Sequence, residues 1–229
     1  MTTKTSPAGF VACAFAAFMA LLAAAPAQAE ANAPAAASAA PQAQAATPLV
    51  IDGFRSAKFG MDEAAVRAAI IADFGVKDAD INAGENAVER TKILTVSVPN
   101  LLPDGGTAQV SYVLGYTSKA LIQIGATWST KTDPAMTPKM LFDNGDVLRS
   151  HFRAEGYQPD SIKLNVALPT GVLMFRGSDS QGHATLLLLQ GTYTDGADGA
   201  KTLTPTSLDL LYSANPDAPD IFKLQQGAF

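Results

Sequence analysis

Two segments of the chain repeat apolar residues at the three- and four-residue spacing of an amphipathic helix. The first segment follows Gly60, and its apolar stripe consists of Val66, Ala69, Ile70 and Phe74. Asp62 has the side chain of a good N-cap, and Gly75 suits the left-handed conformation that ends many helices. The pattern therefore predicts a helix between Asp62 and Gly75.

The second segment begins at Thr137 and Pro138, a pair typical of an N-cap and a first helical turn. Its stripe consists of Leu141, Gly145, Leu148 and Phe152. A glycine on the apolar stripe lowers helix propensity and indicates close contact between the helix and a sheet. The alternative is a break at Gly145, with the helix beginning at Asp146.

Elsewhere apolar and polar residues alternate, which is the pattern of antiparallel strands with one buried face. Between the helices, after a polar loop, three strands place on the buried face Leu94, Val96, Val98, Val110, Tyr112, Leu114, Tyr116, Ile122, Ile124, Ala126 and Trp128. Their other face carries Thr95, Ser97, Gln109, Ser111, Gln123 and Thr127. After the second helix, strands are predicted over 162–168, 171–177, 183–193 and 206–212.

This order predicts an α+β domain over residues 48–214, with an antiparallel sheet of about six to seven strands and two helices on one face. The stretches "KALIQIGATW" and "HATLLLLQGTY" are alike, since each follows a turn and closes on Gly, Thr and an aromatic residue. They allow a tandem helix-plus-three-strand repeat, with halves at 50–130 and 136–214. A domain without a repeat is the alternative.

The N-terminal segment, residues 1–29, has the features of a secretory signal peptide. An apolar run over 10–25 follows Lys4, and the small residues Ala27 and Ala29 frame a cleavage site. We expect cleavage after Ala29 rather than a transmembrane helix, because the run is shorter than the roughly 20 residues that a span needs. The protein is therefore expected to be exported, periplasmic or secreted, without a stable membrane anchor.

The mature chain would begin with an Ala- and Pro-rich flexible tether over 30–47. It would end with the tail 215–229, for which docking and a loose end are both open. Cleavage removes Cys13, which excludes disulfides, thiol nucleophiles and cysteine metal ligands. It also leaves fifteen Lys and Arg against twenty-one Asp and Glu, a net charge of −6. Such an acidic chain is a poor nucleic-acid binder, since phosphate neutralisation supplies most of that affinity.

No arrangement of residues with catalytic or metal-binding spacing is evident. His151 is expected at a boundary or solvated position of the second helix, and His183 at an exposed turn. Neither has the spacing of a zinc motif. Asp195 and Asp198 fit a Gly-rich hairpin turn, because Thr206 stands where a calcium loop needs glutamate. We therefore predict no enzyme activity, no metal and no cofactor.

The stretch "KFGMDEAAV", Lys58 to Val66, resembles a feature of small exported bacterial proteins in which Gly and Met or Thr open an acidic helix. The small lipoprotein subunit of the outer-membrane β-barrel assembly machinery and the β-lactamase-inhibitor-protein fold share that helix-then-sheet plan. This chain lacks the lipobox of the former and the disulfide cysteines of the latter, so neither activity is carried over. The resemblance implies an exported α+β domain that binds a partner through its sheet.

Three functions follow from these observations. The first is a non-catalytic binding or protein-interaction domain that meets an envelope protein through the polar sheet face, at Thr95, Gln109, Ser111, Gln123 and Thr127. The second is a carrier that holds a small apolar ligand between helices and sheet. The third is a hydrolase that uses a serine, an aspartate and His183. The absence of a Gly-x-Ser-x-Gly nucleophile elbow argues against the third.

Overall fold

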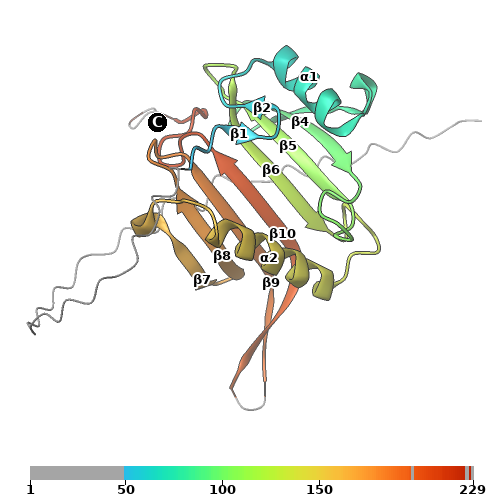
Figure 1. The fold of residues 1–229 in the computed structure, drawn as a ribbon, viewed down its shortest axis with the longest axis vertical. Helices are drawn as coiled ribbons and strands as arrows, with labels where there is room; N and C mark the ends of the chain where they lie inside the picture. Colours follow the sequence, from blue (N-terminus) through green and yellow to red (C-terminus); the bar gives the residue numbers. More distant parts are fainter. Residues whose placement is uncertain (1–48, 197–198, 225–226, 228–229) are drawn as a thin grey trace, which may run out of the picture. The chain divides into compact units, whose positions relative to one another are not determined.

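An eight-stranded antiparallel sheet, with both long helices on one of its faces, builds the domain (Figure 1). The computed structural model describes residues 49–196, 199–224 and 227, so the predicted signal peptide and tether lie outside the described residues. The described residues belong to a compact unit that spans Pro48–Phe229. The predicted α+β class is confirmed, but the strand count of six to seven is too low.

The strands of the large sheet follow the order β3-β4-β5-β6-β10-β9-β8-β7. The strands of the first half are β3 (Asn82–Asn86), β4 (Thr91–Val98), β5 (Ala108–Leu114) and β6 (Leu121–Ser129). Those of the second half are β7 (Lys163–Leu168), β8 (Gly171–Ser178), β9 (Ala184–Asp195) and β10 (Lys201–Ser213). A separate two-stranded hairpin, β1 (Gly53–Phe54) and β2 (Ala57–Lys58), precedes the first helix.

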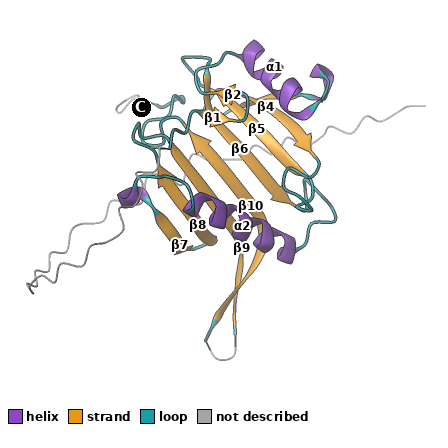
Figure 2. Cartoon of the chain, viewed as in Figure 1, coloured by secondary structure: helices purple, strands orange, loops and turns teal. Residues whose placement is uncertain are grey.

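Each helix is followed along the chain by four strands, rather than the three of the predicted repeat. Figure 2 distinguishes the two long helices from the strands of the sheet. The helices are α1 (Glu63–Phe74) and α2 (Pro138–Arg153), with short 3-10 turns η2 (Asp78–Asp80) and η3 (Pro159–Ser161). The strand that the sequence did not predict is β3. It is a polar edge strand beside β4, and its sequence "NAGEN" shows no alternation of apolar and polar residues. The last strand of each half meets the other at the centre of the sheet, β6 beside β10.

This topology also corrects the sequence alignment of the two halves. The similar stretches "KALIQIGATW" and "HATLLLLQGTY" form β6 and β9, which are the fourth strand after α1 and the third strand after α2. By position in the fold, the counterpart of β6 is β10. The similarity therefore reflects the like composition of two buried strands. It does not align strands that hold the same position in the two halves.

Both predicted ends of α1 and the predicted start of α2 are confirmed, whereas α2 ends at Arg153, before the Gly156 expected to stop it. The Asp62 side chain accepts the N–H of Ala65, and Gly75 adopts the left-handed conformation at the end of α1. The Thr137 side chain accepts the N–H of Met140, and α2 then runs without a break through Gly145. A Cβ atom on Gly145 would lie 2.6 Å from the Met174 sulfur, so this glycine allows α2 to approach β8 closely.

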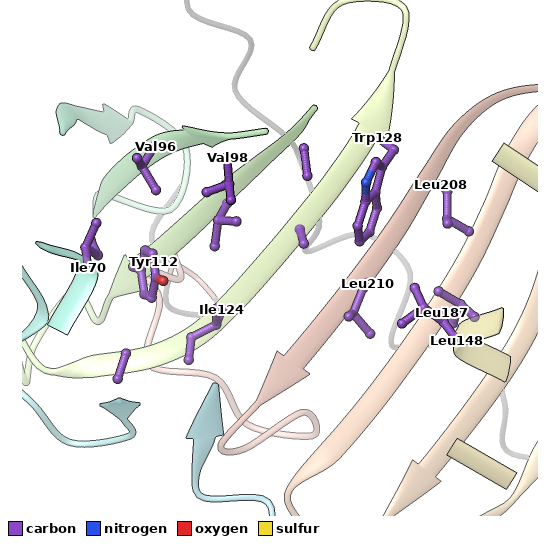
Figure 3. Packing of buried hydrophobic residues seen from close by; sticks show 14 of the residues in the cluster. Ile70, Val96, Val98, Tyr112, Ile124, Trp128, Leu148, Leu187, Leu208 and Leu210 are labelled. Atoms are coloured by element: carbon purple, nitrogen blue, oxygen red, sulfur yellow. The ribbon is translucent and has the colours of Figure 1, made fainter. Parts of the chain in front are cut away.

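The core fills the space between the helices and the sheet. Trp128, Leu208 and Leu210 occupy the central strands, and apolar residues from both halves form one continuous layer around them (Figure 3). Trp128 is buried, as predicted. The β1–β2 hairpin adds Phe54, whose ring stacks on Tyr212 at 5.7 Å. The described part of the chain contains no helix with the length and hydropathy that a membrane span requires.

The segment that follows β10 docks on the end of the sheet. The Phe222 ring packs against Tyr116 and lies 4.0 Å beneath the Arg90 guanidinium. The Asp220 carboxylate accepts the backbone N–H groups of Thr117 and Ser118, at 3.0 and 2.7 Å. Burial alone would raise the pKa of Asp220, but these donors lower it to about 2. The contacts of Asp220 and Phe222 show that this part of the tail docks, whereas Leu224 is 63% exposed.

Replacing Asp220 with asparagine is expected to lower the free energy of unfolding at pH 7 by about 1 kcal/mol, because two charge-assisted hydrogen bonds weaken. A depressed native pKa stabilises the fold above the unfolded value near 3.9, and that contribution disappears as the pH falls through about 2. Urea denaturation at pH 7 and pH 2 measures the difference, with Asp217→Asn as the exposed control. A difference that stays constant down to pH 2 contradicts this assignment.

Candidate functional site

The sheet face opposite the helices, here called the helix-free face, gathers all five residues predicted from the alternation pattern. Cross-strand pairing places Thr95 beside Ser111 and Gln109 beside Thr127. Gln123 lies on the same face, four residues before Thr127 on β6. All five side chains are half-buried. The antiparallel register therefore brings polar positions on β4, β5 and β6 onto one face, which they share with Ile93, Val113 and Gly125.

At the centre of this face lies a carboxylate that the sequence reading did not single out. Asp209 on β10 is directly opposite Thr127 on β6. Its oxygens accept hydrogen bonds from Thr127 Oγ1 at 2.8 Å, Gln190 Nε2 at 2.8 Å and Ser207 Oγ at 2.9 Å. We call these four residues the Asp209 cluster. Three strands, β6, β9 and β10, thus converge on one acidic group.

The Asp209 cluster contains no cationic side chain. Asp209 is only 3% exposed, and it takes part in none of the ion pairs formed among the described residues. Burial raises the pKa of Asp209, while the donors from Thr127, Ser207 and Gln190 oppose that rise. A buried carboxylate that is held only by neutral donors costs stability, because its lost hydration is not fully replaced.

The rest of the helix-free face divides by polarity around Asp209. Towards β4 and β5 lie the polar side chains described above. Towards β8 and β9 lie Leu173, Leu186 and Leu188. Leu188 is opposite Asp209 on one side and Leu173 on the other, and Leu186 is opposite Leu211 and Arg176. The β7–β8 edge adds the cations Lys163 and Arg176. An apolar patch next to a polar rim, with one buried charge between them, is the composition of many protein interfaces.

A signal for Asp209 was present in the sequence. In the stretch "TSLDLLY", Leu208, Leu210 and Tyr212 share the core face, so strict alternation assigns Asp209 to the opposite face. An acidic residue on a strand of otherwise apolar character is unusual, because Asp is depleted in strands. What the sequence does not reveal is that β10 lies beside β6, which brings Asp209 to Thr127.

His183 forms a carboxylate–imidazole pair with Asp179. His183 was expected to be exposed, but its side chain is only 20% exposed and its Nδ1 lies 3.1 Å from Asp179 Oδ2. Asp179 also accepts the backbone N–H of Ile51, Gln181 and His183, so it braces the β8–β9 turn against the start of the domain. Burial alone would raise the pKa of Asp179, but those N–H donors hold it below its usual value.

Among the described residues, no serine or threonine hydroxyl bonds to either imidazole. His151 is exposed on α2 and pairs with Glu155 at 3.0 Å. Nor do three or more His, Cys, Asp or Glu side chains gather into a metal-binding group within the described ranges. Asp195 pairs instead with Lys201 across the β9–β10 hairpin, and Asp198 lies outside the described residues.

Comparisons with known proteins provide no further guide to the site. No family model, curated protein or solved structure matches the chain. The function must therefore be argued from the geometry of the domain itself.

Proposed function

We propose that the protein is an exported, non-catalytic interaction domain that binds a protein partner through the helix-free face of its sheet. The Asp209 cluster is the observation that carries this proposal. A carboxylate that costs stability and has no cation within the described residues is a candidate for a binding role, since perturbed buried charges concentrate at functional sites.

The chemistry of the face favours one kind of partner. A lysine or arginine of the partner would supply the cation that Asp209 lacks. It would donate a charge-assisted hydrogen bond to Asp209 Oδ1, which accepts only from Thr127, whereas Oδ2 already accepts from Gln190 and Ser207. Apolar side chains beside that cation would cover Leu186 and Leu188. The mixture of one desolvated charge and an adjoining apolar patch matches the centre of protein interfaces.

The location is part of the same proposal. The signal-peptide features of residues 1–29 and the Ala- and Pro-rich composition of 30–47 support export of a domain on a flexible tether, with the periplasm as its compartment. The resemblance of Lys58–Val66 to small exported helix-plus-sheet proteins remains a prediction that points the same way.

A pair of matched substitutions tests the use of this face. Ser111 lies half-buried on the helix-free face, and Ser150 is exposed on α2 on the opposite side of the sheet. Ser111→Arg places a long side chain across the polar surface and is expected to reduce partner capture from envelope extract at least 10-fold. Ser150→Arg adds the same side chain and should leave capture unchanged. Equal capture by both variants, with both folded, overturns the proposal.

A further inference from the structure

A recess lies on the other side of the sheet from the helix-free face, beside α2. This groove, here called the α2 groove, has a volume of about 430 Å³ and is bounded by α2 and by strands β7 to β10. Its apolar lining includes Phe142 from α2, Met174 from β8, Leu189 from β9 and Leu203 from β10. The volume falls within the roughly 300–1,000 Å³ of small-molecule sites.

The groove exists because the β9–β10 hairpin continues past its neighbours (Figure 1). Pairing of β8 with β9 ends at Gly171 and Gln190, and pairing of β6 with β10 ends at Ser207. Beyond these points β9 and β10 pair with each other, apart from a backbone hydrogen bond of 2.9 Å from the Gly191 N–H to the Thr170 carbonyl, and no further strand flanks Leu203. The Tyr193 hydroxyl donates to the Gly171 carbonyl at 2.8 Å and ties the start of the projecting part to β8.

The packing of α2 leaves apolar surface on the wall of this recess. Phe142 is 48% exposed although it lines the groove. Gly145 draws the helix onto Met174, which forms part of the groove floor. Such a half-exposed aromatic side chain favours ligand binding, because a ligand in the groove would remove the apolar surface of Phe142 from water.

The charged residues of the lining are both cations. Lys139 and Arg149 line the groove, whereas their carboxylate partners Asp143 and Asp146 are not among the lining residues. The Arg149 guanidinium is fixed in place, because Nη1 donates to Asn165 Oδ1 at 2.7 Å and Nη2 lies 2.9 Å from Asp146. A cation held at the rim of an apolar recess is complementary to an anionic group attached to an apolar body.

We propose that the α2 groove binds a small apolar molecule that carries one anionic group, such as an alkyl carboxylate. The alkyl part contacts Phe142, Met174 and Leu203, and the anionic group pairs with Arg149 at the rim. This site is separate from the helix-free face, so it does not depend on the proposed partner binding. It gives the carrier function anticipated from the sequence a defined location and ligand chemistry.

Titration calorimetry of the full mature chain with three ten-carbon probes tests the proposal. Decanoate supplies the anionic group, decanol a neutral one and decyltrimethylammonium a cationic one. We expect one decanoate per chain, bound at least 10-fold more tightly than decanol, and no heat from the cationic probe. Equal affinity for decanoate and decanol contradicts recognition of the anionic group by Arg149. Absence of decanoate binding overturns the whole proposal.

Two variants locate the site. Arg149→Gln is expected to weaken decanoate binding at least 10-fold and to leave decanol binding unchanged. Arg153→Gln removes the same charge from an exposed position of α2 that does not line the groove, and it should have no effect. Thermal unfolding of each variant verifies that it is folded. Equal weakening by both variants indicates general charge attraction and contradicts a site at Arg149.

Discussion

Replacing Asp209 with asparagine is expected to weaken partner binding about 100-fold while it stabilises the free domain. Binding weakens because the partner's cation loses its carboxylate, and truncating one member of a buried charge pair costs about 2–5 kcal/mol. The free domain gains about 1 kcal/mol at pH 7, the scale of a single buried polar group, since the unpaired charge is removed. The asparagine Oδ1 still accepts from Thr127, and its Nδ2 donates to the Ser207 and Gln190 oxygens once the Ser207 hydroxyl and the Gln190 amide turn.

The stabilisation has a defined dependence on pH. Burial raises the native pKa of Asp209 above its unfolded value near 3.9. A raised native pKa means that the contribution of this group to stability is complete below the unfolded pKa and is lost as the pH rises through the native pKa. The advantage of asparagine is therefore present at pH 7 and disappears below about pH 4.

Urea denaturation across that range and binding assays at pH 7 measure the two effects separately. Asp160→Asn, at an exposed position in η3, is the control and should change neither quantity. If Asp209→Asn destabilises the domain at pH 7, the cluster is a structural brace and its assignment to binding fails. If binding is unchanged in a stabilised variant, the partner does not contact Asp209.

Replacing Phe152 with alanine is expected to lower the free energy of unfolding by about 3–5 kcal/mol. Phe152 is 2% exposed and lies at the centre of an aromatic group that holds α2 on the sheet. Its ring centroid is 5.3 Å from Phe175, 6.3 Å from Tyr157 and 6.4 Å from Tyr212. Alanine removes these contacts and leaves a cavity that rigid strands on one side cannot fill.

Chemical denaturation measures this loss, with Val147→Ala as the control on the same helix. Val147 is 60% exposed, so its truncation should change the free energy of unfolding by less than about 0.5 kcal/mol. A loss below about 1 kcal/mol for Phe152→Ala contradicts the view that α2 is anchored by the aromatic group.

The local pattern of the sequence predicts the two helices and the faces of the central strands well. Helix ends at Asp62, Gly75 and Thr137 follow from the hydrogen-bonding preferences of single residues, which act over three or four positions. Alternation assigns Thr127 and Trp128 to opposite faces, because the side-chain period of a strand is fixed by its geometry. These effects act between residues that are close in the sequence, so the local sequence pattern is sufficient to predict them.

Other features depend on contacts that local patterns do not encode. The polar edge strand β3 has one neighbour and no apolar face, so its sequence reads as a loop. On β7, Asn165 has a φ of 53° and no register partner, which places Leu164 and Val166 on opposite faces despite their spacing of two. The Asp209 cluster depends on β10 pairing with β6, a contact between residues 82 positions apart.

Site-specific photo-crosslinking in the native envelope tests the central proposal most directly. A photoreactive amino acid at Gln123 lies on the helix-free face, and the same amino acid at Arg153 lies exposed on α2. The proposal predicts one adduct from position 123 that maps to a partner peptide containing lysine or arginine, that is lost with Asp209→Asn, and that is absent from position 153. An adduct from position 153 alone, or one from position 123 that is indifferent to Asp209→Asn, contradicts it.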